Sequence, residues 1–377
     1  MRQIIYKGYD SIKNLRNILE KESPSKIFLV VDKDSYSICG AEEKTRTILQ
    51  GKRYVVFDDF EVNPKLDDAI KGIEIFRNEK CDFIIGTGGG SVLDMAKAIS
   101  ILNSQLETPL RCVKDSSIIR DKKIKSVLIP TTAGTGSEST HFSVVYIDKT
   151  KYSLMHDSIL ADYVILDPVF TEALPPYITA CTGMDGLCQA IESFWSVQST
   201  EESRKYSQKA IELILPNIVQ AANNPNRNLR EEMLLGSNFS GMAINIAETT
   251  AAHSISYPFT SFFNIPHGHA VALTLPYFFE YNYDVDDDTL NDKRGVKFVK
   301  SKMDELLGIL KVKSPLEARE KFIDIMKEIG LETSLLKLGI DNEGTEIIIG
   351  NGFNPQRMKN NPKKVTKESL RELLNNI

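Results

Sequence analysis

Short apolar runs alternate with amphipathic stretches in the first half of the chain. The runs occupy residues 26–32, 54–58, 83–86 and 127–130. Continuous β-branched runs of this length are typical of strands buried in a parallel sheet. Between two of them, from 65 to 79, apolar residues recur every three or four positions, which predicts a helix packed on a sheet. The pattern therefore predicts an α/β domain with a doubly wound sheet.

From Asp167 and Pro168 onward the pattern changes to long helical stripes, for example at 203–214 and 303–310, and strand-like runs nearly vanish. A chain of 377 residues also exceeds the size at which one hydrophobic core usually stops growing. We therefore expect two domains. Residues 1–167 would bind a dinucleotide, and residues 168–377 would form a helical domain that binds metal and substrate.

The composition excludes several classes of protein. Apolar residues make up 42% of the chain and charged residues 26%, as in ordinary soluble enzymes, and the formal charge of −5 gives no broad attraction to nucleic acid or anionic lipid. The five cysteines are odd in number and widely spaced, which argues against a disulfide framework or structural zinc. The amino terminus lacks the apolar core of a signal peptide, and no segment approaches the ~20 apolar residues of a membrane span. We expect a cytoplasmic protein without nucleic-acid or membrane partners.

A glycine-rich turn follows the run at 83–86 and leads into an apolar helix at 92–99. Glycine permits positive φ and lets the backbone approach a pyrophosphate, which free N–H groups and the helix dipole then stabilise. The turn is not a G-x-G-x-x-G fingerprint, because Ser91 stands at the last glycine position. A tight loop without a ligand is the alternative. We predict phosphate contacts from Gly88, Gly89, Gly90 and Ser91.

Two further features favour a dinucleotide. Asp32 ends the first strong strand, where a carboxylate commonly binds the adenosine ribose and repels a 2′-phosphate, so NAD(H) is favoured over NADP(H). The alternative is that Asp32 caps a helix. A second turn, residues 130–138, also follows a strand and offers hydroxyl groups to the phosphates or the nicotinamide.

A metal site is predicted in the second half. Asp185 and Gln189 lie four apart on an expected helix, ~40° around its axis and ~6 Å along it, so both oxygens can reach one ion. Pro258 and Pro266 are expected to interrupt any helix between His253 and the later histidines, so that separate elements supply the imidazoles.

Two histidines, His267 and His269, compete for one place in this site. If a helix covers them, their side chains point ~200° apart, so only one can join the cluster, and the spacing to His253 does not choose between them. A hydrogen-bonded core histidine, or a helix-capping role for Asp185, is the alternative. Three of the five histidines lie within seventeen residues among Pro, Gly and aromatic neighbours, which favours a cleft. A metal that polarises a carbonyl, with a cofactor that supplies hydride, indicates an alcohol or aldehyde oxidoreductase.

Four segments, 86–97, 130–138, 174–185 and 266–270, resemble the iron-containing (group III) alcohol dehydrogenases, and the resemblance runs over nearly the whole chain. It implies a Rossmann-like amino-terminal domain with a parallel sheet and an all-α carboxy-terminal domain, the fold shared with dehydroquinate synthase. It also implies a nicotinamide cofactor, a divalent metal and a homodimer.

The resemblance assigns the metal ligands. Asp185, His253 and His267 match family ligands, whereas Gln189 stands where the family has a second histidine. A neutral amide oxygen is a harder and weaker donor, so the preference among Fe²⁺, Zn²⁺ and Mn²⁺ moves toward manganese or magnesium. Tyr257 replaces a further family histidine, and its phenol either relays a proton or fills space.

The predicted site residues are these. The catalytic residues are Asp185, His253, Tyr257 and His267, and the metal ligands are Asp185, Gln189, His253 and His267. The cofactor-binding residues are Asp32, Asn63, Gly88, Gly89, Gly90, Ser91, Asp94, Thr131, Thr132, Thr135, Ser137 and Lys151.

Within the family, residues 188–203, 141–146 and 151–154 resemble the phosphonoacetaldehyde reductases, which implies reduction of phosphonoacetaldehyde to 2-hydroxyethylphosphonate. Lys151, His141 and the basic segment 357–364 are the candidate cations for the phosphonate. Three alternatives are open: a reductase of another small aldehyde such as butanal or lactaldehyde, a lyase resembling dehydroquinate synthase, and a non-catalytic protein with a degenerate site at Gln189.

Overall fold

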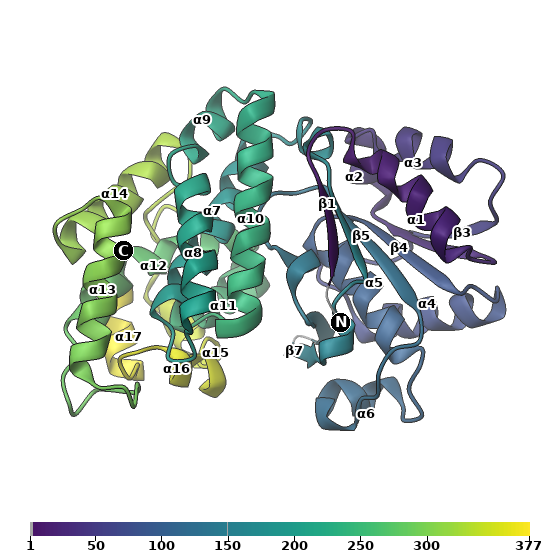
Figure 1. Cartoon of the computed structure of the whole chain (residues 1–377). Coiled ribbons are helices and arrows are strands. Elements are labelled where there is room, and N and C mark those ends of the chain that lie inside the picture. Colours follow the sequence, from purple (N-terminus) through teal and green to yellow (C-terminus); the bar gives the residue numbers. More distant parts are fainter. Residues whose placement is uncertain (1–2, 149) are drawn as a thin grey trace. The chain divides into compact units, whose positions relative to one another are not determined.

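A parallel sheet forms the centre of the first half of the chain in the computed structural model, which describes residues 3–148 and 150–377 (Figure 1). The six strands lie in the order β1 (Ile4–Lys7), β8 (Tyr163–Leu166), β5 (Lys125–Pro130), β4 (Phe83–Gly88), β2 (Ile27–Val31) and β3 (Tyr54–Phe57). Each neighbouring pair is parallel. The predicted α/β class is confirmed.

Alternate residues of the central strands face two separate cores. Ile27, Leu29 and Val31 pack with α1 (Asn14–Glu22), α2 (Lys33–Ile38) and α3 (Ala41–Leu49). Phe28 and Val30 pack with α4 (Leu66–Asn78), α5 (Gly90–Leu102) and α6 (Pro109–Lys114) on the opposite face. Short 3₁₀ helices lie at Ser11–Lys13, Ser116–Ile118, Ser137–Ser139, Asp157–Ile159 and Pro168–Thr171.

This arrangement creates a switch point between β2 and β4. The two strands are neighbours, with Val31 paired to Thr87, but β2 leads into α2 and α3 on one face and β4 leads into α5 on the other. Open α/β sheets bind their ligands at such a point, beyond the carboxyl ends of the strands. Asp32 and the glycine-rich turn both lie there.

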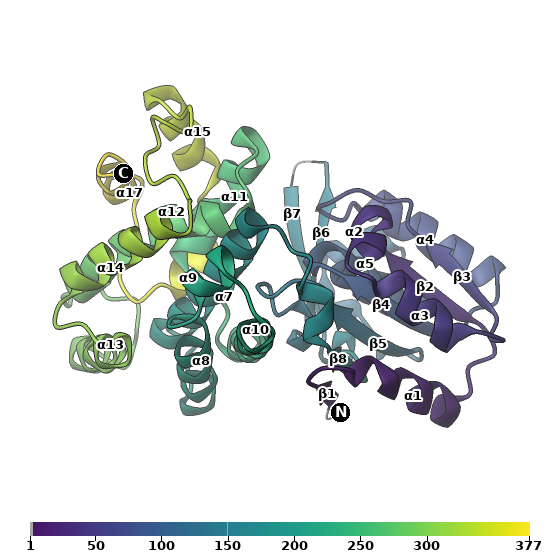
Figure 2. The same cartoon turned by 90° about the horizontal axis from the view of Figure 1, so that it is seen from above.

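An antiparallel hairpin of β6 (Phe142–Ile147) and β7 (Thr150–Met155) forms a separate two-stranded sheet (Figure 2). No prediction covered it, and β1 and β8 were also not predicted. These strands are four to six residues long, and β1 and β7 are largely exposed or half-buried, so neither shows a long apolar run.

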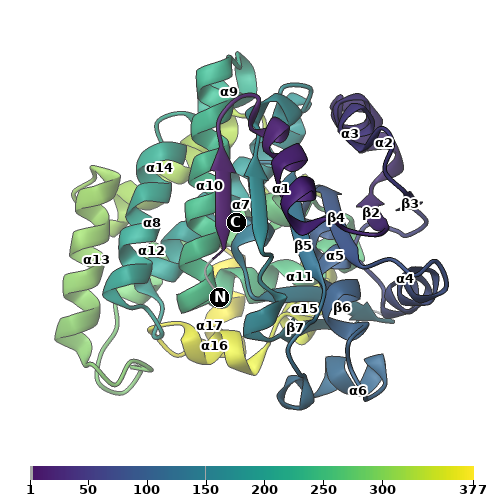
Figure 3. The ribbon, with the colours of Figure 1, turned by 45° about the vertical axis from the view of Figure 1, so that its right-hand side comes forward.

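Helices make up the second half. They are α7 (Pro176–Trp195), α8 (Glu201–Ile214), α9 (Ile218–Asn223), α10 (Arg227–Ala247), α11 (Ala251–Phe263), α12 (His267–Tyr283), α13 (Val296–Leu310), α14 (Pro315–Glu328), α15 (Asn342–Asn351), α16 (Pro355–Asn360) and α17 (Lys367–Leu374). Nearly every residue of α7 from Thr179 onward is buried. Helices α8, α9, α12 and α13 pack around α7 (Figure 3). The predicted helical half is confirmed.

The chain divides into two compact units. The first comprises Met1–Leu174 and Asn226–Leu234, and the second comprises Pro175–Pro225 and Leu235–Ile377. Within the part of the chain that the structure describes, no helix is long and apolar enough to cross a membrane.

Candidate functional site

Three helices of the second unit bring a carboxylate and two imidazoles together. Asp185 lies on α7, His253 on α11 and His267 on α12. Asp185 Oδ1 is 3.3 Å from His253 Nε2 and 3.8 Å from His267 Nε2, and the three donor atoms all lie within 4.8 Å of one another. A cation bound at about 2.0–2.2 Å by nitrogen and oxygen places neighbouring donors about 3–3.5 Å apart. The Asp185–His253 distance has this value, and His267 Nε2 lies slightly farther out at 3.8 Å, so a small movement of His267 would complete a set of three metal donors.

The hydrogen bonding of these atoms supports the same interpretation. In the described part of the chain, Asp185 Oδ1 and His253 Nε2 are buried, lie 3.3 Å apart and have no hydrogen-bond partner of good geometry. A buried polar atom without a partner costs about 1–3 kcal/mol. Because the two atoms lie 3.3 Å apart, one bound cation could contact both. The residues therefore fit the divalent metal that the sequence predicts.

The charges of the site are coupled. Burial disfavours the protonated ring of His253, but Glu192 and Asp185 outweigh burial and raise the pKa of His253 to about 9. Burial likewise disfavours the Asp185 carboxylate, and His267, His253 and a hydrogen bond from Gln189 outweigh it and lower the pKa of Asp185. Asp185 is therefore ionised, and a cation bound at this site would have to displace a proton from His253.

The two imidazoles come from separate helices, although Pro258 does not separate them as predicted. Pro258 lies inside α11, where its ring removes one helical hydrogen bond without ending the helix. The helix ends after Phe263, where Asn264 takes a left-handed conformation with φ of 56°. Pro266 then caps α12, so that His267 is its first residue.

Close packing between α7 and α12 depends on Gly268, for which no role was predicted. A Cβ atom at this position would lie 1.9 Å from the carbonyl oxygen of Cys181 and 2.9 Å from Cβ of Asp185. Only glycine lets the first turn of α12 approach α7 this closely. The approach brings His267 beside Asp185.

The other predicted residues of the metal half differ in their contacts. His269 forms two hydrogen bonds. Its Nε2–H donates to the Glu332 carbonyl oxygen at 2.7 Å, and its Nδ1 lies 3.3 Å from the Tyr177 hydroxyl. The ring of Tyr257 stacks on that of His267, with centroids 6.0 Å apart and an interplanar angle of 19°. Gln189 is buried on α7, and its Oε1 accepts a 3.3 Å hydrogen bond from the Ser240 hydroxyl.

In the first unit, the glycine-rich turn leads directly from β4 into α5, with Gly89 as the N-cap. The backbone N–H of Asn63 donates a 3.3 Å hydrogen bond to the Ser91 hydroxyl, which brings Asn63 to the turn. The expectation that the glycines supply positive φ is wrong, since none of Gly88, Gly89 and Gly90 has one. They allow close packing instead, because a Cβ at Gly90 would lie 2.8 Å from Cγ2 of Thr135.

The second turn packs against the first. The N–H of Thr131 donates to the Gly88 carbonyl oxygen at 3.0 Å, and a Cβ at Gly89 would lie 3.4 Å from Thr132. Thr132 and Thr135 are half-buried, whereas Thr131 and Ser137 are buried. The two turns therefore form one small polar surface at the carboxyl end of the sheet.

A buried ion pair holds the second turn in place. Lys97, which is 2% exposed, lies 3.0 Å from Asp94 Oδ1 and donates to the Ser137 carbonyl oxygen at 2.8 Å. Asp94 accepts hydrogen bonds from the Ser137 hydroxyl and, at 3.1 Å, from the N–H of Val144 on β6. Asp94 and Ser137, both predicted to bind the cofactor, are thus buried and hydrogen-bonded to each other.

Replacing Asp94 with asparagine is expected to destabilise the first unit by up to about 3–5 kcal/mol, because buried Lys97 loses its directly paired carboxylate and keeps only the weaker interaction with Glu138. Chemical denaturation followed by circular dichroism measures the change, and the Kd for NADH should rise with it. The exposed Asp67 on α4 supplies the control, since Asp67→Asn should leave the unfolding midpoint almost unchanged. Equal midpoints for the Asp94 variant and the unaltered protein would contradict the role of this ion pair.

Asp32 lies at the switch point and also caps a helix. Its Oδ1 accepts a 2.8 Å hydrogen bond from the N–H of Ser35 at the start of α2, so the helix-cap interpretation is confirmed for one oxygen. Lys151 lies on β7, paired with Tyr146 across the hairpin.

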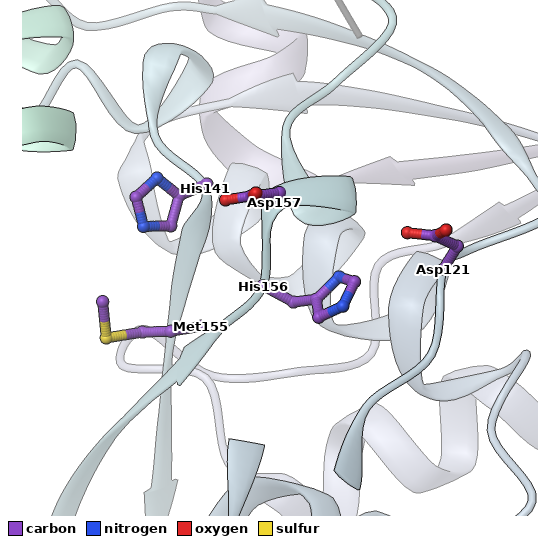
Figure 4. A pocket seen from close by; sticks show the side chains of 5 residues that line it. All are labelled: Asp121, His141, Met155, His156 and Asp157. Atoms are coloured by element: carbon purple, nitrogen blue, oxygen red, sulfur yellow. The ribbon is translucent and has the colours of Figure 1, made fainter. Parts of the chain in front are cut away.

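Three of the candidate cations for a phosphonate lie near acidic groups: His141 shares a cavity with two carboxylates, and Arg357 and Lys363 form ion pairs. His141 lines a cavity of about 430 Å³ with Asp121, Met155, His156 and Asp157 (Figure 4). Two carboxylates in one cavity do not favour a dianion. In the basic tail, Arg357 is 3.2 Å from Glu248, and Lys363 is 3.1 Å from Asp284.

Comparison with known proteins identifies the family. The family model for iron-containing alcohol dehydrogenases matches residues 3–168, and the model for the C-terminal part of the Fe-containing alcohol dehydrogenase family matches residues 179–377. The chain is 29% identical to the sulfoacetaldehyde reductase of Bilophila wadsworthia over 381 residues, which covers 99% of this chain and 97% of that protein. It is 32% identical to the 1,3-propanediol dehydrogenase of Citrobacter freundii over 358 residues, which covers 92% and 90%.

A solved structure agrees over the same length. The crystal structure of the sulfoacetaldehyde reductase from Bifidobacterium kashiwanohense in complex with NAD⁺ has a TM-score of 0.88 and 29% identity, and covers 99% of this chain and 96% of that one. The fold, the two family models and the full-length relatives all agree. This protein therefore belongs to the iron-containing alcohol dehydrogenase family and is an oxidoreductase that acts on CH–OH groups.

Proposed function

We propose that this protein is a metal-dependent, NAD(H)-linked reductase of a small anionic aldehyde, and that it reduces phosphonoacetaldehyde to 2-hydroxyethylphosphonate. The observation that carries the chemistry is the convergence of Asp185, His253 and His267, with two buried donor atoms that lack a hydrogen-bond partner. Family membership favours a reductase over the lyase and over a non-catalytic protein.

The substrate proposal rests on the relatives and on the motifs. Proteins named sulfoacetaldehyde reductase match this chain over nearly its whole length. Sulfoacetaldehyde and phosphonoacetaldehyde are both two-carbon aldehydes that carry an anionic group on the second carbon. Sulfoacetaldehyde is therefore the second candidate substrate, and lactaldehyde and butanal follow.

In this proposal Asp185, His253 and His267 hold the cation, and Gln189 is the fourth ligand. Gln189 Oε1 accepts from the Ser240 hydroxyl and its NH₂ group donates to Asp185, so the amide would reorient for its oxygen to bind the ion. When bound, the cation polarises a carbonyl oxygen and the reduced nicotinamide supplies hydride. Tyr257 holds the His267 ring by stacking, and its hydroxyl is the candidate proton donor to the alcohol oxygen.

For the cofactor, we infer that the Gly88–Ser91 turn and the start of α5 bind the pyrophosphate. The hydroxyl groups of the second turn, with Asn63 and Lys151, complete the cofactor site, and Asp32 favours NAD(H) over NADP(H). The neutral Gln189 moves the metal preference among Fe²⁺, Zn²⁺ and Mn²⁺ toward manganese. A cytoplasmic homodimer completes the proposal.

Initial rates of NADH oxidation at 340 nm test this function across phosphonoacetaldehyde, sulfoacetaldehyde, lactaldehyde and butanal, with NADPH in parallel. We expect kcat/KM for phosphonoacetaldehyde to exceed that for butanal at least about tenfold, since a bound anion contributes more than about 1.4 kcal/mol. Activity should disappear after chelation and return with single divalent ions. Equal or better use of butanal would reject the anionic substrate, and a preference for sulfoacetaldehyde would select the second candidate. No NADH consumption with any aldehyde would reject the reductase.

A further inference from the structure

Glu192, which is not one of the proposed metal ligands, places a fully buried carboxylate beside His253. Glu192 is 0% exposed and lies on α7, seven residues after Asp185. Its Oε2 accepts a short hydrogen bond from His253 Nδ1. Asp185 Oδ1 lies 3.3 Å from Nε2 of the same ring. The imidazole is thus held between two carboxylates of one helix.

The other oxygen of Glu192 is fixed by the beginning of α11. Oε1 accepts from the Thr250 hydroxyl at 2.7 Å, from the Thr250 N–H at 3.1 Å and from the His253 N–H at 3.3 Å. The Thr250 hydroxyl in turn accepts a 3.1 Å hydrogen bond from Nε1 of Trp195. The three hydrogen bonds to Oε1 fix the orientation of the Glu192 carboxylate, because rotating it would break them.

We propose that Glu192 is a positioning residue for the metal ligand His253. By accepting a hydrogen bond from Nδ1–H, Glu192 fixes the orientation of the ring and leaves the Nε2 lone pair free to bind the metal. Histidine ligands commonly donate their second N–H to a carboxylate in this way, and loss of that partner weakens metal binding about 10–100-fold. The inference rests on the proposed metal site.

The sequence spacing agrees with this assignment. Asp185, Gln189 and Glu192 lie at positions i, i+4 and i+7, and so on one face of α7. One helix therefore supplies both the proposed ligands and the carboxylate that orients a ligand from α11. A simple helix-capping role for Glu192 would account for Oε1 and leave the contact of Oε2 with His253 without a purpose.

Glu192→Gln separates positioning from capping. The three donors at Oε1 require an acceptor, so the glutamine oxygen must take that place and its NH₂ group must face His253 Nδ1. A donor at this position requires an unprotonated Nδ1, and the ring proton then resides on Nε2. His253 would be held in the form that cannot bind a cation, with almost no change in side-chain volume.

The experiment measures the Kd of the full-length protein for Co²⁺ by chelator competition, together with the visible spectrum of the Co²⁺ form. We expect Glu192→Gln to weaken binding about 10–100-fold and to alter the spectrum, while the Tm of the metal-free protein stays within a few degrees. Glu192→Asp keeps an anionic acceptor and should recover most of the affinity. Ser193→Ala is the matched control, because Ser193 is the next buried residue of α7 and bonds to the Ser207 hydroxyl at 2.8 Å.

Unchanged Kd and spectrum in Glu192→Gln would overturn the inference while leaving the metal site intact. Failure of the unaltered protein to bind Co²⁺ would instead reject the proposed function and the inference with it. If Glu192→Gln does not fold, the unaltered Zn²⁺ form labelled with ¹⁵N-histidine decides. A His253 signal with a protonated Nδ1 and a metal-bound Nε2 supports the inference, and a metal-bound Nδ1 overturns it.

Discussion

Replacing His267 with alanine should abolish aldehyde reduction and leave the Kd for NADH within about twofold. The change removes one of three donors that lie within 4.8 Å of one another. Loss of the cation removes Lewis-acid stabilisation worth several kcal/mol, and each 1.36 kcal/mol is a factor of ten in rate, so kcat should fall by about 10³ or more. The proposed NADH contacts lie in the other compact unit, in the turns after β4 and β5. Steady-state rates and NADH fluorescence titration measure the two effects separately.

His269→Ala is the matched control for this variant. His269 lies two residues further on α12, and burial lowers its pKa, as expected for a neutral core histidine that contacts Glu332 and Tyr177. The control should lose some thermal stability and keep its metal affinity. Full activity in His267→Ala, or loss of metal from His269→Ala instead, would reject the ligand assignment.

The sequence predicts those parts of the fold that have strong local patterns. β2 is a continuous apolar run, β4 and β5 each contain one, and α4 has a clear apolar stripe, so the positions of these elements follow from the local pattern alone. The β6–β7 hairpin is different. β6 has only two buried residues and β7 only one, so neither strand shows a long apolar run or a clear alternation. Their pairing depends on contacts between the two strands, which the composition of each strand does not reveal.

The site shows the same division. Helical geometry alone predicts that Asp185 and Gln189 share a face, and that His267 and His269 point apart. The choice between the two histidines depends on the packing of α12 against α7, which no local pattern contains. Glu192 also escaped prediction, because a glutamate in a helix has no local feature that indicates a partner 61 residues later.

Gly268→Ala should disrupt the metal site without removing any donor. The added Cβ would lie 1.9 Å from the Cys181 carbonyl oxygen, which is backbone of a buried helix and cannot turn aside. The start of α12 must then move away from α7 by more than about 1 Å to restore van der Waals contact. His267 moves with it, and its 3.8 Å separation from Asp185 increases. A displacement of about 1 Å at a reacting centre costs about 10²-fold in rate, so we expect kcat and metal affinity each to fall about 100-fold or more.

Gly308→Ala provides the control for a glycine that needs no close approach. Gly308 lies in α13, and a Cβ there would meet no atom within 4 Å, so alanine should raise helix stability slightly and leave metal binding unchanged. Co²⁺ titration of both variants, with circular dichroism to compare their folding, distinguishes the two glycines. A Gly268→Ala protein that folds and binds Co²⁺ as tightly as the unaltered protein would show that the contact between α7 and α12 does not set the geometry of the metal site. Loss of affinity in a folded Gly268→Ala protein would assign that geometry to helix packing as much as to the ligands themselves.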